Sequence, residues 1–163
     1  MPVIAITVIN MFFSTLIFVL IARFYLMPKL GTMSTAEALQ PLLLFHGMRH
    51  IGLVFLSSGV ARPGLAQEFA IPAAYGDLAA AILALVALAA LRNRSSVATP
   101  LVWLFNIVGT VDLFAALTIG IMYDATAYMG AGYFLPAVVV PALLVTHYII
   151  FKLLMGRKAM AVS

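Results

Sequence analysis

The chain contains no cysteine. Disulfides, thiolate metal sites, iron–sulfur clusters and dithiol redox relays are therefore excluded within it. Charged residues are also scarce: they make up 9% of the 163 residues, whereas hydrophobic residues make up 65% and the mean hydropathy is +1.17. Because soluble domains carry far more charge than this, the sequence predicts an integral membrane protein with little mass outside the bilayer.

Period-two alternation is missing from apolar runs such as residues 78–91, which argues against membrane β-strands. Backbone polar groups inside a bilayer must be paired, so helices are the remaining way to cross it. A crossing helix needs about 20 apolar residues, and several stretches are long enough. We predict an all-α, polytopic transmembrane helical bundle that forms one domain over residues 1–163, with five spans at about 3–25, 40–60, 74–92, 99–123 and 131–155.

Basic residues fall almost entirely on alternate connections between these spans. Seven of the nine cations share one predicted side: Arg23, Lys29, Arg92, Arg94, Lys152, Arg157 and Lys158. Cytoplasmic loops are enriched in Lys and Arg, so we predict an N-out, C-in protein of the bacterial inner membrane, with the lipid bilayer as a partner. Orientation and anionic lipid headgroups explain the cations, and no nucleic-acid partner is expected.

The second predicted span carries three polar residues that a lipid-facing helix would avoid, namely His46, Arg49 and His50. An arginine near the bilayer centre costs about 2.5–3.5 kcal/mol on insertion scales, so it needs partners inside the bundle. At about 100° per residue, these three side chains and Ser57 would share one face of an α-helix. We therefore predict that all four point into the bundle.

Polar residues of other spans fall at comparable depths when the helical rise is counted from the cytoplasmic side. The predicted intramembrane polar belt, a candidate transport or binding site, consists of Asn10, His46, Arg49, His50, Asn106, Asp112 and His147. Asp112 shares a helical face with Gly109, Ala116 and Gly120, small residues that let a neighbouring helix approach. Asp112 is therefore the expected counter-charge for Arg49.

Three interpretations of this belt stay open. In the first, polar contacts and an Arg49–Asp112 pair only fix the register of the helices. In the second, the belt carries a small solute or protons, because ionisable residues that face a bundle interior often mark such a route. In the third, His46, His50 and His147 bind a divalent metal or haem b. The first two interpretations need no cofactor.

Catalytic motifs are missing from the chain. It has no G-x-S-x-G, H-E-x-x-H or P-loop sequence, and no acidic cluster for metal-assisted chemistry on phosphate groups. An enzyme acting on a lipid or a quinone, with His50 as general base and Asp112 orienting it, is a variant of the second interpretation. Without a nucleophile motif, the sequence argues against an enzyme.

Residues 49–59, RHIGLVFLSSG, resemble the R-x-x-G-x-x-F-L-x-x-G opening of the DoxX-like small bacterial membrane proteins. The resemblance extends over residues 49–93 and includes Asp77, which precedes an Ala/Leu-rich helix where that family tends to carry a carboxylate. DoxX-like proteins look like four-helix bundles that partner membrane-bound redox enzymes. The resemblance implies an accessory subunit with a membrane redox partner, and only Arg49 and Asp77 carry over.

Three further features concern packing. Gly76, Ala80, Ala84 and Ala87 form a stripe of small residues that predicts close helix contact. Pro136 and Pro141 remove backbone donors and predict an irregular fifth span, while residues 61–76 are expected to form an outer connection along the headgroups or across the bundle mouth. Because five short helices enclose little space, a homo-oligomer is also expected.

Overall fold

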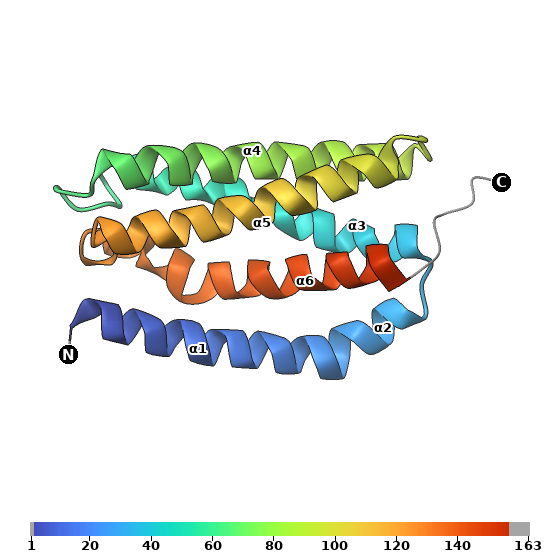
Figure 1. Ribbon diagram of the computed structural model, residues 1–163, viewed down its shortest axis with the longest axis horizontal. Coiled ribbons are helices and arrows are strands. Elements are labelled where there is room, and N and C mark those ends of the chain that lie inside the picture. The colour runs from blue at the N-terminus through green and yellow to red at the C-terminus, as the bar shows by residue number, and fades with distance from the viewer. Residues whose placement is uncertain (1, 157–163) are drawn as a thin grey trace.

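The computed structural model describes residues 2–156 of the chain, and no strand occurs among them. Within this range, five helices are long and apolar enough to cross a membrane, at Val3–Gly31, Thr35–Leu56, Gln67–Arg92, Ala98–Met122 and Gly130–Gly156. Figure 1 shows them as rods that run alongside one another. The prediction of an all-helical chain with five potential spans is confirmed for these residues.

Several of the five rods are composite. The first consists of α1 (Val3–Ile21), a π-helical turn at Ala22–Leu26 and α2 (Met27–Gly31). The second joins α3 (Thr35–His46) to a 3-10 helix, η2 (Gly47–Leu56). The third and fourth are α4 (Gln67–Arg92) and α5 (Ala98–Met122). The fifth follows short 3-10 turns at Ala125–Ala127 and Gly130–Tyr133, and joins a π-helical segment, η5 (Leu135–Val139), to α6 (Val140–Gly156).

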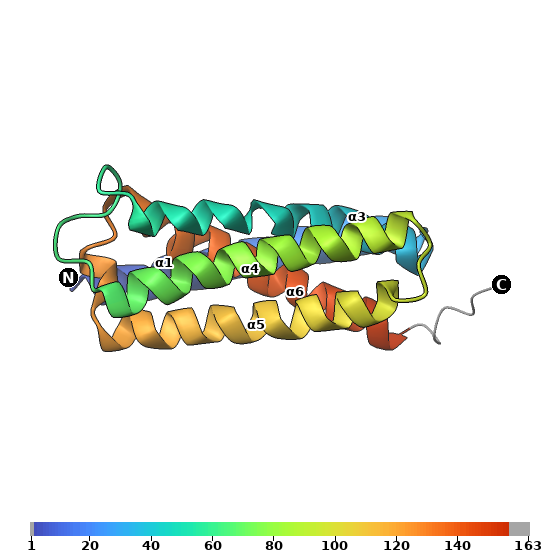
Figure 2. The same cartoon turned by 90° about the horizontal axis from the view of Figure 1, so that it is seen from above.

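The two ends of the bundle differ in charge. One end, which we call the basic end, holds the α2–α3 turn, the α4–α5 turn and the end of α6 (Figures 1 and 2). Five cations lie in the segments that lead to it: Arg23, Lys29, Arg92, Arg94 and Lys152. The opposite end, the N-terminal end, holds residue 2, the connection 57–66 and the connection 123–130. The predicted basic residues Arg157 and Lys158 lie outside the described residues.

The second rod does not follow the regular α-helix that the sequence predicted. A capping box starts α3 at Thr35, because the Ser34 side chain accepts a hydrogen bond from the Glu37 backbone and the Glu37 carboxylate accepts one from the Ser34 backbone. From Gly47 the chain winds as a 3-10 helix, with three residues per turn in place of 3.6. The rod ends at Leu56.

This tighter winding decides which side chains face inward. Residues three apart superimpose in a 3-10 helix, and accordingly Arg49, Gly52 and Phe55 are all buried. His50 and Ser57 are exposed. The prediction that both of them share the inward face with Arg49 was therefore wrong, because it assumed 100° per residue where the chain turns by about 120°.

The third rod begins earlier than predicted. Residues 67–76 form the first turns of α4, with Pro72 inside the helix, so the outer connection predicted over residues 61–76 ends at Ala66 instead. Phe69 points inward from this part of α4 and its ring centroid lies 5.2 Å from that of Phe55. Further along α4, the predicted packing stripe is confirmed, since Ala80, Ala84 and Ala87 are fully buried.

The two halves of the bundle are packed differently. Toward the basic end, large apolar side chains such as Leu39, Phe105 and Ile150 fill a continuous core with the alanines of α4. Toward the N-terminal end, a smaller cluster around Phe55, Phe69 and Met129 closes the tip of the bundle. The fifth rod is irregular near its prolines, as predicted, because Pro136 lies in the π-helical segment η5. Between the two clusters lies the site described next.

Candidate functional site

Arg49 lies at the centre of the polar side chains. Only 3% of its surface is exposed, yet its guanidinium meets groups from three other rods. Its Nε donates to Asp77 Oδ1 of α4 at 2.8 Å, and its Nη2 donates to Asp112 Oδ2 of α5 at 2.5 Å. Its Nη1 donates to the Gly109 carbonyl at 3.0 Å. The expected Arg49–Asp112 pair is present, and Asp77 forms a second ion pair with the same guanidinium.

Glycines make this convergence possible. A Cβ atom on Gly52 would collide with the Asp77 carboxylate, and one on Gly76 would collide with the Asp112 carboxylate. A Cβ on Gly109 would press on the Arg49 guanidinium and the His147 ring. Each glycine therefore opens space for a charged side chain from a neighbouring rod, where any larger residue would force the charges apart.

The cluster contains more negative than positive charge. Asp77 and Asp112 both contact the single guanidinium, and their side chains are 16% and 18% exposed. With both carboxylates ionised, the three groups carry a net charge of −1. One bound proton would make the cluster neutral, and a low-dielectric interior favours neutral groups. The geometry therefore suits a group that takes up and releases a single proton.

His147 extends the cluster toward the basic end. Asn106 Nδ2 donates to the His147 carbonyl at 3.3 Å, which orients the amide so that Oδ1 faces His147 Nδ1 at 2.7 Å. Because Oδ1 can only accept, Nδ1 carries the hydrogen and Nε2 is left as an acceptor. Nε2 lies 3.4 Å from Arg49 Nη1. The neutral imidazole is thus positioned to accept from the guanidinium.

His46 lies beside His147, with ring centroids 4.1 Å apart. Its Nε2 lies 3.0 Å from the Thr146 hydroxyl, which in turn contacts the carbonyls of Ala142 and Leu143. Since the hydroxyl donates to a carbonyl, it accepts from Nε2–H of His46. His46 Nδ1 is buried and has no hydrogen-bond partner among the described residues.

The remaining histidine does not join this pair. His50 is exposed, and its Nδ1 lies 3.0 Å from the Gly47 carbonyl of its own helix. The third interpretation, in which His46, His50 and His147 bind one metal, does not fit this geometry, because the 3-10 winding turns His50 outward. In residues 2–156, no three His, Asp or Glu side chains are grouped so that they could hold a metal ion. The direct contact of the His46 and His147 rings also differs from two haem ligands, which sit on opposite faces of the iron.

Asn10 was predicted to belong to the same belt, but the structure places it elsewhere. Its side-chain amide donates to the Tyr133 hydroxyl at 3.0 Å, which ties α1 to the turn before η5. Neither Arg49 nor a histidine contacts it in the part of the chain described. The connected polar cluster therefore consists of Arg49, Asp77, Asp112 and the pair His147 and Asn106, with His46 in ring contact.

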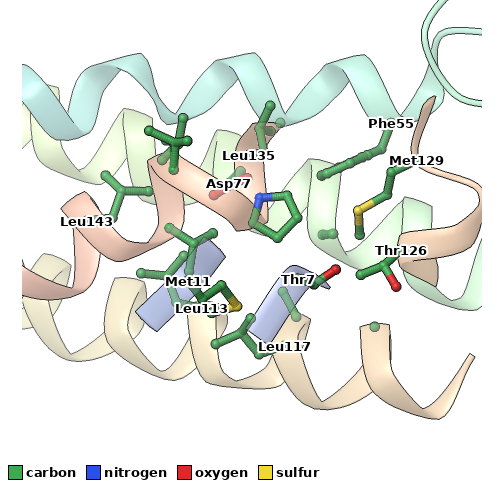
Figure 3. A pocket seen from close by; sticks show the side chains of 18 of the residues that line it. Thr7, Met11, Phe55, Asp77, Leu113, Leu117, Thr126, Met129, Leu135 and Leu143 are labelled. Atoms are coloured by element: carbon green, nitrogen blue, oxygen red, sulfur yellow. The ribbon is translucent and has the colours of Figure 1, made fainter. Parts of the chain in front are cut away.

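An apolar cavity of about 350 Å³ adjoins the cluster on the side of the N-terminal end. Figure 3 shows its wall, with Asp77 among side chains such as Met11, Phe55 and Leu117. Its lining comes from all five rods and from the connection between α5 and the fifth rod, and the only charged residues in that lining are Arg49 and Asp77. The cavity size falls within the range of small-molecule sites, which is about 300–1,000 Å³.

Comparison with family models gives one match. Residues 6–155 match the model described as domain of unknown function DUF8737. The chain belongs to the DUF8737 family. No curated protein and no solved structure matches the chain. The DUF8737 match includes most or all of each of the five potential spans and says nothing on the DoxX-like resemblance, which stays a prediction.

Two parts of this DUF8737 site were not predicted from residue patterns. The predicted third span, at about 74–92, would put Asp77 close to its outer end; with α4 starting at Gln67, Asp77 lies about 15 Å along the helix. The only signal that singled it out was the DoxX-like resemblance. No sequence pattern indicated the cavity, because most of its lining residues are of the same apolar types that fill the core.

Proposed function

We propose that this DUF8737 protein is a proton-coupled carrier of a small lipophilic solute. In this proposal it spans the bacterial inner membrane five times, with its N-terminus outside and its C-terminus inside. The observation that carries the proposal is the convergence of two carboxylates on one buried guanidinium at the wall of an apolar cavity. Ionisable residues inside a membrane bundle often mark such routes.

The uneven packing of the bundle supports a carrier. A cavity next to the charged cluster occupies the half toward the N-terminal end, whereas the half toward the basic end holds the larger apolar core, with a more open groove between the first rod and α6. A carrier that exposes its site to one side at a time needs such an asymmetry. The charged cluster lies at the boundary, where a change in its protonation would act on η2, α4 and α5 together.

The polar contacts beyond Arg49 support proton movement. His147 accepts from the guanidinium, and the His46 ring lies against His147 on the side of the basic end. His147 Nε2 faces Arg49, and His46 Nδ1 is buried without a hydrogen-bond partner among the described residues, so each imidazole keeps one nitrogen that can accept a proton. The pair therefore adds candidate proton acceptors between the cluster and the basic end.

A pH step tests the proton site without knowledge of the solute. Proteoliposomes on a sensor surface should give a transient charge displacement when the outside pH is lowered, because protons move from water into the cluster. Asp77→Asn and Asp112→Asn should remove the transient, and Glu68→Gln, which changes an exposed carboxylate of α4, should keep it. A wild-type signal equal to that of protein-free liposomes would contradict the proposal.

The proposed topology has a direct test because the chain has no cysteine. Ser58→Cys lies in the exposed connection at the N-terminal end, and Ser96→Cys lies in the exposed α4–α5 turn at the basic end. In intact cells, a membrane-impermeant maleimide should label Ser58→Cys and leave Ser96→Cys unlabelled until the cells are opened. The reverse labelling would overturn the N-out, C-in arrangement.

A further inference from the structure

We infer that the cavity binds a lipophilic organic monocation, which exchanges with one proton on the Arg49–Asp77–Asp112 cluster. This inference rests on the proposed function and names its substrate class. It starts from the net charge of −1 on the cluster when both carboxylates are ionised. Either a proton or a monovalent cation restores neutrality, and the two cannot be held together without an excess positive charge in the bilayer interior.

The lining of the cavity selects an organic cation over a metal ion. Hard metal cations need about six oxygen ligands, and the cavity wall offers few. Apart from Asp77, its side-chain oxygens are those of Thr7 and Thr126. The Thr7 hydroxyl already donates to the Val3 carbonyl at 3.0 Å. An inorganic ion would therefore lose more hydration than the cavity could replace.

Aromatic and thioether side chains make up a quarter of the residues that line the cavity, among mainly aliphatic neighbours. Four phenylalanines and three methionines line it: Phe18, Phe45, Phe55, Phe69, Met11, Met48 and Met129. Aromatic faces attract organic cations, and methionine adapts to ligands of irregular shape. The Thr126 hydroxyl, buried in the same wall, has no hydrogen-bond partner among the described residues and is free to meet a polar group of the ligand.

Access to the cavity runs through the flank of the bundle. The cluster around Phe55, Phe69 and Met129 closes the tip at the N-terminal end. Some lining residues are exposed on the lateral surface, among them Val8 of α1 at 59% and Met48 of η2 at 54%. A solute that partitions into lipid can therefore reach the cavity from the membrane, as expected for a lipophilic cation.

The exchange balances in charge and in atoms. When the cation enters, the O–H bond of the protonated Asp77 or Asp112 carboxyl breaks, the proton leaves to water, and the ionised cluster faces the cation through Asp77, the carboxylate that lines the cavity. The titratable and charged groups that meet at the cluster come from every rod around it except the first: Arg49 of η2, Asp77 of α4, Asp112 of α5 and His147 of α6. The first rod contributes only apolar side chains and Thr7 to the cavity. One proton per cation makes the exchange electroneutral.

Binding of tetraphenylphosphonium to the full-length protein in lipid nanodiscs tests this inference. We expect saturable binding by equilibrium dialysis, release of one proton per bound cation, and an apparent Kd that rises about tenfold for each pH unit on the acid side, the limit for competition with one proton. Asp77→Asn should lose at least tenfold in affinity, while Glu68→Gln should match the wild type. The wild-type pH dependence needs no variant, so it keeps the test valid if Asp77→Asn fails to fold.

The outcomes separate the two proposals. If the pH step produces its transient but tetraphenylphosphonium neither binds saturably nor releases a proton, the cation inference fails and the proton site stands. Binding that ignores pH and persists in Asp77→Asn would mean apolar partitioning alone, which also overturns the inference. If both the transient and the proton-linked binding are absent, the proposed function fails with it.

Discussion

Replacing Arg49 with alanine is expected to destabilise the folded protein strongly. The change leaves Asp77 and Asp112 facing each other without a counter-charge in the interior of the bundle. Removing one partner of a buried ion pair costs about 3–5 kcal/mol, and here the guanidinium also holds the Gly109 carbonyl and His147 in place. We expect Arg49→Ala to lose most of its yield after detergent extraction and to unfold at lower temperature, as measured by circular dichroism.

Two further variants show whether a loss of stability in Arg49→Ala comes from unpaired buried charge. Arg62→Ala removes an exposed arginine from the connection at the N-terminal end and should retain wild-type stability. The triple change Arg49→Met, Asp77→Asn, Asp112→Asn removes all charge together and should recover much of the folded yield, because no buried charge remains unpaired. Normal stability of Arg49→Ala alone would show that the cluster does not hold the rods together.

Neutralising one carboxylate should change the stability little, whereas neutralising both should lower it strongly. Asp77→Asn or Asp112→Asn alone leaves one carboxylate for one guanidinium, so the cluster is neutral without a proton. Each single variant should therefore fold close to wild type but bind no proton. The double variant leaves Arg49 buried without a counter-charge and should lose about 3–5 kcal/mol, the cost of breaking a buried pair. Thermal unfolding of the three variants, with Glu68→Gln as the control, measures this.

The relative stabilities of the single and double variants distinguish a proton-binding cluster from a purely structural one. A structural ion-pair network without a proton would predict that each single variant is destabilised and that the losses accumulate in the double variant. Single variants that are already unfolded would therefore contradict the charge count on which the proton site depends. Equal stability of the single and double variants would show that Arg49 does not require either carboxylate.

Composition and hydropathy were enough to predict five potential spans, because apolar length is a property of each segment alone. The Arg49–Asp112 pair was also predictable. A buried arginine needs an anion, and Asp112 lay well inside the apolar stretch of the fourth predicted span. The stripe Ala80, Ala84 and Ala87 followed from spacing. In each case one physical requirement, burial or charge pairing, applied, and few residues of the sequence could satisfy it.

Other parts of the site depend on backbone choices that hydrophobicity does not report. The inward face of the second rod follows the 3-10 winding of η2, and this winding separates Arg49 from His50. The depth of Asp77 depends on α4 starting at Gln67, although Pro72 suggested a connection there. Ser34 and Glu37 carry a capping-box signature that marks the start of α3 at Thr35, about five residues before the predicted start of the second span. The cavity depends on how all five rods pack, and no single segment encodes it.

The most direct test of the central claim is an infrared pH titration of the protein in lipid. A protonated carboxyl group in an apolar site has a C=O stretch distinct from that of a carboxylate. We expect wild-type protein to show the C=O band of one carboxylic acid, which disappears as the pH rises. The band should be absent from both Asp77→Asn and Asp112→Asn but retained in Glu68→Gln. A wild-type spectrum without that band at any pH at which the protein is folded would contradict the claim that the cluster binds an exchangeable proton.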